Sequence, residues 1–471
     1  MTEQPTERGN TFLEFSVLVT AVAVLMLAVL ELHVKPQAAL ADGPAVASAD
    51  GIERVAPVDS WTVTATSPID GSRRLAAVGT GSSAPATRSV RIDLDEIGQE
   101  WMGVGGAFTD VSVDLLAADG DALGLLFDPS RADGAQLDLG RLPLSATDFS
   151  ATAWTWGWDA RSRVATPTAE ARRAADVTIA AFELQPDLGL VATPWTAPDS
   201  MIASDGGLAT DAQADYAALL RQQVEWLLAT GAPIDAISLA NEPGHLADYP
   251  SMTISDEQLV DLARTVRPAL DANGVDLWAV DHNWADRDRV DTVIDGADFD
   301  AAAFHCYEGT PDQMAGLSVP AVVTECTGTD DNWTSTFGWD SRVLVTESIR
   351  AGASGLLMWN LAQTPDTVTL PGGCDNCRGL LTIDPAAGTV APGPEFFTLA
   401  HLSRAADPGA VRVGTNRVDR FPTVAFVNPD GTVGVFGHND TDASQVVEIE
   451  TTAGDRTAFT IGPWEMFSIR H

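Results

Sequence analysis

The chain has 471 residues, 45% of them apolar, which is enough for a large folded core and excludes a disordered protein. Its 27 lysines and arginines face 66 aspartates and glutamates, so the formal net charge is −39. A field of that sign repels phosphate backbones and anionic lipid headgroups, and we therefore expect no nucleic-acid partner. The charge itself indicates a solvated acidic surface.

An uncharged apolar segment lies near the N-terminus. Residues 15–30 read FSVLVTAVAVLMLAVL, and the longer stretch 12–34 approaches the length of a membrane span. A small-x-small triplet ends at Ala41, yet the residues before the apolar segment are hardly basic. Residues 1–41 are therefore predicted to be a cleaved signal peptide or a membrane anchor, with a linker over 42–56. Either way the body is extracytoplasmic, and it touches a membrane only through residues 12–34 if these are uncleaved.

The two flanks of the chain have the pattern of antiparallel strands. Apolar and polar residues alternate over residues 57–100 and again over residues 409–471, where turn pairs such as Asp430-Gly431 interrupt them. Neither flank alone supplies enough strands for a sandwich. We therefore predict that both flanks pair into one antiparallel β-sandwich.

Between the flanks, residues 101–408 contain eight short apolar runs separated by stretches with helical spacing. The runs are GVGGAFT, DLGRLPLS, GLVATPWT, AISLANEP, DLWAVDHN, AAAFHCYEG, AVVTECTG and SGLLMWN. Near-continuous hydrophobicity indicates strands buried on both faces, as in a parallel sheet. The sequence therefore predicts an α/β fold, a (β/α)8 TIM barrel with the attached β-sandwich.

Four cysteines bear on redox state and metal binding. Cys374 and Cys377 have no second Cys/His pair at zinc-finger spacing, so we expect them to form a disulfide in an oxidising compartment. Cys306 and Cys326 end neighbouring apolar runs and are predicted to be buried thiols. No metal and no cofactor are expected.

Two glutamates at predicted strand ends carry the strongest chemical signal. Glu242 closes the run DAISLANE and Glu325 closes AVVTE. Cleaving a glycosidic bond with retention needs two carboxyl groups about 5 to 5.5 Å apart, one to protonate the leaving oxygen and one to attack the anomeric carbon. Because chemistry in such barrels sits at the carboxyl ends of the strands, both glutamates are predicted to meet there.

Many blocks of the chain resemble glycoside hydrolase family 30, the family that includes lysosomal glucosylceramidase. In the order of that family they are GVGGAFTD, RLPLSATDFS, TPWTAPDSM, NEP, YPSM, DHN, HCYEG, TEC, WNLA, CRGLLTID and FFTLAHLSR. They cover nearly all of residues 103–413. Each block alone is weak evidence, but so many in one order are highly specific.

The resemblance implies a role for each matching residue. It makes Glu242 the general acid/base, Glu325 the nucleophile, and Asn241 a hydrogen-bond partner of the sugar 2-hydroxyl. The other predicted substrate-binding residues are Asp110, Asp148, Trp195, His305, Tyr307, Trp359 and Asn360. Asp110 and Asp148 each have a helix- or loop-capping role as an alternative. Arg141, His282 and Asn283 are expected to orient these groups.

The proposed cycle sets expectations for the two carboxyl groups. The pKa of Glu242 is expected to be raised by burial and by the nearby Glu325, so that it carries a proton near neutral pH. Glu325 is expected to stay ionised because Tyr307 and His305 donate hydrogen bonds to it. Such a pair predicts a bell-shaped pH profile.

The substrate prediction follows from the resemblance and from departures at the expected pocket rim. The family implies retaining hydrolysis of β-glycosides, and we expect β-glucosides, in the manner of glucosylceramidase. Cys306, Met358 and the loop PGGCDNCRGLL differ from the lysosomal enzyme. The alternatives are a β-xylosidase, a β-fucosidase, a β-1,6-glucanase, or a catalytically silent surface protein that binds a β-linked glycan.

Overall fold

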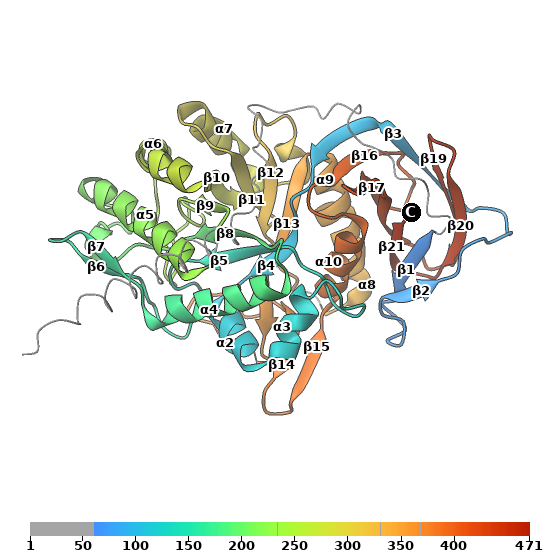
Figure 1. Cartoon of the computed structure of the whole chain (residues 1–471), viewed down its shortest axis with the longest axis horizontal. Helices are drawn as coiled ribbons and strands as arrows, with labels where there is room; N and C mark the ends of the chain where they lie inside the picture. Colours follow the sequence, from blue (N-terminus) through green and yellow to red (C-terminus); the bar gives the residue numbers. More distant parts are fainter. Residues whose placement is uncertain (1–60, 233, 330, 367–368) are drawn as a thin grey trace, which may run out of the picture. The chain divides into compact units, whose positions relative to one another are not determined.

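The computed structural model describes residues 61–232, 234–329, 331–366 and 369–471 (Figure 1). The predicted signal peptide or anchor over 1–41 and the linker over 42–56 lie outside these residues. Within the described part, no helix has both the length and the apolar character needed to cross a bilayer.

Eight parallel strands close into a barrel. They are β4 (Gly103–Ala107), β5 (Leu139–Pro143), β8 (Gly189–Thr193), β9 (Ala236–Ser238), β10 (Asp276–Asn283), β11 (Ala301–His305), β12 (Ala321–Glu325) and β13 (Ala353–Gln363). Each pairs with the next in chain order, and β13 closes the ring by pairing with both β12 and β4. The predicted TIM-type barrel is confirmed, and each apolar run named above contributes one strand.

Helices follow most of the barrel strands, with short hairpins and 3-10 turns between them. The longer ones are α2 (Asp110–Ala118), α3 (Gly120–Phe127), α4 (Ala169–Leu184), α5 (Gln213–Thr230), α6 (Asp256–Asn273), α7 (Arg287–Gly296), α8 (Trp333–Trp339) and α10 (Pro394–Ala405). The remaining elements of the barrel region are β6 (Gly157–Asp159), β7 (Val164–Thr166), β14 (Gly379–Asp384), β15 (Thr389–Pro392), η2 (Asp199–Met201), η3 (Thr210–Ala212), η4 (Trp284–Asp286), η5 (Pro311–Met314), the π-helix η6 (Asp340–Glu347) and α9 (Ser348–Arg350).

Local sequence signals set the helix ends. Ser255 and Gln258 form a reciprocal capping box at the start of α6, which satisfies two backbone N–H groups that have no partner inside the helix. The same helix ends at Gly274, whose φ of 66° suits a residue without a Cβ atom. α5 likewise ends at Gly231.

The strands of the two chain flanks form one nine-stranded sheet with its own core. They are β1 (Thr62–Thr66), β2 (Ala76–Val78), β3 (Arg88–Glu100), β16 (Val411–Thr415), β17 (Thr423–Val427), β18 (Val433–His438), β19 (Gln445–Thr451), β20 (Arg456–Ile461) and β21 (Met466–Arg470). Their order is β2-β1-β21-β18-β17-β16-β3-β19-β20. The side chains of Phe421, Phe459 and Phe467 pack together inside it. The predicted pairing of both flanks is therefore confirmed.

One strand pair departs from the predicted antiparallel pattern. β3 and β19 run parallel, whereas the other pairs of this sheet are antiparallel. β3 comes from the N-terminal flank and β19 from the C-terminal flank, so no tight turn joins them. Only a short hairpin forces neighbouring strands to run antiparallel, and this pair lacks that constraint.

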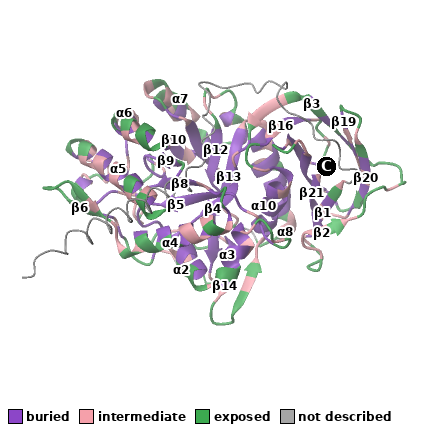
Figure 2. Cartoon of the chain, viewed as in Figure 1, coloured by how far each residue is buried: buried purple, intermediate pink, exposed green. Residues whose placement is uncertain are grey.

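Helix α10 joins the barrel to the sandwich. His401 on this helix is buried, and its ring nitrogens lie 3.0 Å from the Ser468 hydroxyl and 2.9 Å from the Thr66 hydroxyl. A Cβ atom on Gly434 of β18 would stand 1.7 Å from the carbonyl oxygen of Ala405 at the end of α10. Only glycine permits that approach, so α10 rests directly on the sheet. Figure 2 shows the buried residues concentrated on the barrel strands and on α10.

Candidate active site

The two predicted catalytic glutamates meet at the carboxyl end of the barrel. Glu325 is the last residue of β12, and Glu242 stands four residues beyond the end of β9 in a left-handed backbone conformation, with φ 44°. One carboxylate oxygen of each glutamate and one ring nitrogen of His305 lie within 4.8 Å of one another. That separation suits the direct attack of a retaining mechanism, because inverting enzymes need a wider gap for water.

Two buried or partly buried donors hold the carboxylate of Glu325 in place. Glu325 is 6% exposed and accepts hydrogen bonds from the guanidinium of Arg141 and, at 2.9 Å, from the hydroxyl of Tyr307. Burial by itself would lower the pKa of Arg141, but the charges of Asp281 and Glu325 raise it. Arg141 therefore remains a cation beside Glu325.

Glu242 is hydrogen-bonded to a histidine, and this contact changes where the catalytic proton is expected to lie. Nδ1 of His305 lies 2.9 Å from Oε1 of Glu242, and Nε2 of His282 lies 3.9 Å from the same oxygen. Burial alone would raise the pKa of Glu242, but the hydrogen bond and charge of His305, with His282 and His245, lower it. The prediction of a raised pKa is wrong for this site without substrate, because it left out the histidines.

The proton shared between Glu242 and His305 resides on His305. Burial would lower the pKa of His305, but Glu325, Asp281 and Glu242 together raise it to about 9. Nε2 of His305 is 3.2 Å from Asp281 but 4.0 Å from Glu325. His305 therefore bonds Glu242 and Asp281 instead of Glu325, and of the two predicted donors only Tyr307 reaches Glu325.

Asp281 is the functional residue that the sequence did not single out. It is fully buried, and both of its carboxylate oxygens accept hydrogen bonds. The donors are Arg141 (3.0 Å), Thr193 (3.2 Å), Ser238 (2.7 Å), His305 (3.2 Å) and Thr324 (2.6 Å). Burial would raise the pKa of Asp281, but Arg141, His305 and Thr324 hold it well below its usual range. This one anion fixes both the cation beside Glu325 and the histidine beside Glu242.

A backbone irregularity brings Asp281 into the barrel. Trp278 lies with the apolar side chains that fill the barrel interior, so strict alternation along β10 would turn His282 inward and Asp281 outward. Val280 and Asp281 instead have φ values of 67° and 62°, and the register with β11 shifts between Val280 and His282. Such a bulge re-aims the following side chain. No residue pattern in the segment DLWAVDHN indicates this bulge.

Two predicted aromatic residues form the floor of the site. The rings of Trp195 and Trp359 stack with centroids 5.0 Å apart, and the guanidinium of Arg141 lies 4.6 Å from the Trp195 ring. Trp195 is only 2% exposed and Trp359 only 4%. Trp195 therefore supports Arg141 and Trp359 from beneath. Tyr307, at 45% exposure, is the aromatic side chain that presents an open edge.

Asn241 and Asp148 flank the glutamates. Oδ1 of Asn241 accepts a hydrogen bond from Arg141 at 2.6 Å, which leaves its amide nitrogen to donate elsewhere. Asp148 is 6% exposed, and burial together with the charges of Glu325 and Glu242 raises its pKa to about 7. Its Oδ2 lies 3.4 Å from the backbone nitrogen of Cys374. Asp148 therefore lies near enough to both glutamates to be affected by their charges, and its carboxylate also caps the loop at Cys374, so both predicted roles keep support.

Asp110 and Asn360 do not reach the glutamates by any hydrogen bond among the described residues. Asp110 is the first residue of α2 and accepts from the indole nitrogen of Trp154 at 2.6 Å. Oδ1 of Asn360 accepts from the hydroxyl of Thr109, the N-cap of α2, at 2.8 Å. Adjacent residues of a strand point to opposite faces, so Trp359 faces the site and Asn360 faces the helix.

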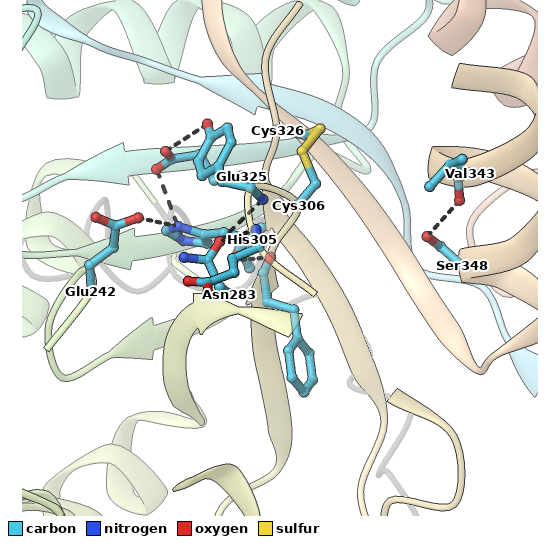
Figure 3. Close-up of a disulfide and its surroundings, with 12 residues drawn as sticks. Glu242, Asn283, His305, Cys306, Glu325, Cys326, Val343 and Ser348 are labelled. Atoms are coloured by element: carbon cyan, nitrogen blue, oxygen red, sulfur yellow. Dashed lines mark hydrogen bonds and ion pairs between the residues drawn. A yellow bond between two sulfur atoms is a disulfide. The ribbon is translucent and has the colours of Figure 1, made fainter. Parts of the chain in front are cut away.

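The two predicted orienting residues after Asp281 act on the surrounding loops. Oδ1 of Asn283 accepts from the backbone nitrogens of Tyr307 and Glu308, both at 3.1 Å, and so fixes the segment that carries Tyr307. Nδ1 of His282 lies 2.7 Å from Asp286, which holds its other nitrogen toward Glu242. Figure 3 shows Glu242 and Asn283 near His305.

A disulfide joins the two strands that carry His305 and Glu325. Cys306 and Cys326 are bonded, with their Cα atoms 5.2 Å apart (Figure 3), so the prediction of two buried thiols is wrong. β11 and β12 are adjacent parallel strands with His305 opposite Glu325, so the next residue of each strand lies within disulfide range. The predicted Cys374–Cys377 disulfide is confirmed, and both cysteines pack near Trp195 and Trp359.

The donor types of Glu242, His305 and Glu325 also occur in metal sites. Glu325 already accepts from Arg141 and Tyr307, and His305 already bonds Glu242 and Asp281. The guanidinium on Glu325 would repel a second cation. The arrangement therefore fits paired carboxyl chemistry better than a metal centre.

Known proteins resemble the chain in both sequence and fold. Residues 409–469 match the sequence profile of the glycosyl hydrolase family 30 beta sandwich domain. An endo-1,6-beta-D-glucanase of Neurospora crassa is 32% identical over 308 residues, which cover 59% of this chain and 62% of that protein. An endo-1,6-beta-D-glucanase of Aspergillus fumigatus is 26% identical over 81% of this chain and 88% of its own length.

Two solved structures share the fold. An endo-beta1,6-glucanase superimposes with a TM-score of 0.77 at 21% identity, over 87% of this chain and 99% of the other. The catalytic domain of a family 30 xylanase C from Talaromyces cellulolyticus gives a TM-score of 0.66 at 18% identity, over 81% and 99%. The barrel, the sandwich and the site define a glycoside hydrolase architecture. Residues 409–469 match the family 30 sandwich domain, and the chain shares the fold of a solved family 30 enzyme.

The comparisons do not support the glucosylceramidase-like specificity that the sequence favoured. The curated relatives described above are endo-1,6-β-glucanases, which correspond to one of the stated alternatives. The departures at Cys306, Met358 and the loop around Cys374 had already distinguished this chain from the lysosomal enzyme.

Proposed function

We propose that the protein is a retaining glycoside hydrolase that cleaves internal β-1,6-linkages of a β-glucan. The observation that carries the proposal is the convergence of Glu242 and Glu325, whose carboxylate oxygens lie within 4.8 Å of each other and of His305. The choice of linkage is supported by the two fungal relatives, each described as an endo-1,6-beta-D-glucanase.

In this proposal Glu325 is the nucleophile. Its ionised oxygen attacks the anomeric carbon, and the bond to the leaving oxygen breaks as the new ester bond forms. Arg141 and Tyr307 aim the carboxylate through their hydrogen bonds to it. The amide nitrogen of Asn241, left free by the bond from Arg141 to its oxygen, donates to the sugar 2-hydroxyl.

Glu242 passes a proton to the leaving oxygen and later removes one from the attacking water. In the site without substrate this proton is held on Nδ1 of His305, 2.9 Å from Glu242. Substrate that displaces water around Glu242 favours its neutral form, because burial penalises the charged carboxylate. The proton then moves along the existing hydrogen bond to Glu242 and onward to the glycosidic oxygen.

The alternative of a catalytically silent glycan-binding barrel is less favoured. Such a protein has no need for two carboxyl groups at attack distance, nor for a buried arginine and a buried histidine that each bond one of them. The β-xyloside and β-fucoside alternatives have no specific observation in their favour. We also infer an extracytoplasmic location, which two disulfides support.

Hydrolysis of a panel of three polysaccharides and one glycolipid tests the proposal. Residues 42–471 would be incubated with β-1,6-glucan, β-1,3-glucan, β-1,4-xylan and glucosylceramide, with Glu325→Gln as the inactive control. The expected result is release of β-1,6-linked oligosaccharides, whose new reducing ends are initially β when followed by proton NMR. Initial α products would contradict retention, and hydrolysis of xylan or glucosylceramide alone would overturn the proposed specificity.

A further inference from the structure

A groove lies along the junction between the barrel and the sandwich, outside the candidate active site. It consists of two adjoining cavities of about 430 and 340 Å3 that share Arg342, Arg420 and Asp440. One wall is the helical face of α8 and η6, with Trp339 and Arg342. The opposite wall is formed by sandwich loops that carry Arg420, Asp440 and Trp464. Neither glutamate of the active site lines it.

Unusual backbone surrounds this groove. The helical wall continues as the π-helix η6 over Asp340–Glu347, a rare conformation that occurs frequently at functional sites. At its end the Ser348 hydroxyl also bonds the Val343 carbonyl, at 3.1 Å (Figure 3). Across the groove, Arg420 and Trp464 have φ values of 51° and 57°. Left-handed backbone in a tryptophan costs free energy and persists where the surroundings enforce it.

The side chains of the groove suit a sugar. Trp339 and Trp464 are partly exposed, so their indole rings are accessible to the apolar face of a pyranose. The guanidinium of the exposed Arg420 lies 5.4 Å from the Trp464 ring, and that of Arg342 lies 3.7 Å from Asp440. A sugar hydroxyl both donates and accepts hydrogen bonds. Guanidinium groups can donate to it and carboxylates can accept from it, while the aromatic rings contact the apolar face of the sugar.

Charge favours a neutral ligand. Four arginines line the groove, Arg342, Arg350, Arg417 and Arg420, against the three acids Glu347, Asp419 and Asp440, so the local balance is 4 − 3 = +1. Two of the arginines are already engaged, since Arg417 pairs with Glu347 and Arg350 bonds backbone carbonyls of the sandwich. A polyanion would also have to approach a chain of net charge −39.

We propose that this groove is an accessory site that binds a neutral β-glucan segment by stacking on Trp464 and Trp339 and by hydrogen bonds to Arg342, Arg420 and Asp440. The identity of the glucan rests on the proposed function. The groove and the catalytic site share no residue, so a polymer long enough to reach both would gain from the second contact, which raises the effective concentration of substrate.

Binding without hydrolysis tests the groove directly. The full chain with Glu325→Gln would be sedimented with insoluble β-1,6-, β-1,3- and β-1,4-glucans, alone and combined with Trp464→Ala or Arg420→Ala. We expect Trp464→Ala to weaken retention by the preferred polymer about tenfold, and Arg420→Ala to weaken it less. Trp61→Ala, which removes another partly exposed indole of the sandwich, stacked on His471, is the matched control and should bind like the parent.

Kinetics on two substrate lengths separate the groove from the active site. In the chain with Glu325 intact, Trp464→Ala should raise KM for the long polymer and leave kcat/KM for a short oligosaccharide unchanged. Equal losses on both lengths would overturn the proposal, as would unchanged polymer binding by both groove variants. Should Trp464→Ala fail to fold, the exposed Arg420 decides the outcome. If the parent hydrolyses none of the glucans, the proposed function fails, while the sedimentation result still decides the groove.

Discussion

The carboxyl end of the barrel and the groove at the junction are built from the same residue types, yet they are suited to different tasks. Each combines tryptophans, arginines and carboxylates, and each contains non-glycine residues with left-handed backbone. In the barrel Arg141 is fully buried, whereas in the groove Arg420 is exposed. Burial strengthens each electrostatic interaction, whereas an exposed polar group remains accessible for hydrogen bonds to a ligand. The comparison indicates chemistry at the first region and binding at the second.

The largest expected effect concerns the nucleophile. Glu325→Gln should reduce kcat by at least about 10³-fold, because the amide cannot form the glycosyl-enzyme. Initial rates on the polymer would measure this, with unchanged polymer sedimentation as evidence of an intact fold. Retention of more than a few per cent of activity would mean that Glu325 is not the nucleophile.

Asp281→Asn tests whether the buried carboxylate organises both catalytic glutamates. Arg141 and His305 would lose their common anion, and we expect kcat to fall about 10²-fold through misplaced groups and the stability to fall by about 3 kcal/mol. Thr324→Val, which removes one donor to Asp281, is the milder control. Activity equal to the parent's in Asp281→Asn would leave the network without a catalytic role.

His305→Asn tests the position of the catalytic proton. The pKa of His305 is raised to about 9, so the proton of the pair is available below that pH and is lost above it. The alkaline limb of kcat/KM should therefore lie near pH 9 in the parent and move to lower pH in the variant. An unmoved limb would assign the proton to another group.

His305 should also make the stability of the fold depend on pH, with stability lost as the pH rises. A raised folded-state pKa stabilises the protein in full below the unfolded value of about 6.5, and that stabilisation disappears as the pH rises through about 9. The stability difference between the parent and His305→Asn should therefore shrink across that interval. Chemical denaturation at several pH values would measure it.

The disulfide beside the site gives a smaller effect. Replacing Cys306 and Cys326 by serine should lower the free energy of unfolding by about 2 to 3 kcal/mol, because the bridge closes a loop with a sequence separation of 20. The bridge between Cys374 and Cys377 spans a separation of only 3, so its removal should cost less. A larger loss for the second pair would show that loop length does not govern the difference.

The smallest effect on chemistry is expected in the groove. Trp464→Ala should change polymer binding and leave cleavage of short substrates intact, whereas each change in the barrel should lower both. A groove variant that impairs short-substrate cleavage would remove the distinction between the two regions.

The sequence by itself determined the architecture and the two glutamates. Eight apolar runs predicted eight buried strands, because a parallel sheet is covered on both faces, and alternation predicted the flanking sheet. Glu242 and Glu325 were found because they directly follow such runs. The end of an apolar run marks the carboxyl end of a strand, and in a barrel of this type these ends all lie at one face.

Only the tertiary structure decided the features that depend on pairing between distant segments. The bulge that turns Asp281 inward, the Cys306–Cys326 bridge, the parallel β3–β19 pair and the outward position of Asn360 all follow from strand register. The proton on His305 likewise required its distances to Glu242 and Asp281. Register and burial are properties of neighbouring elements, and no single segment of the sequence contains them.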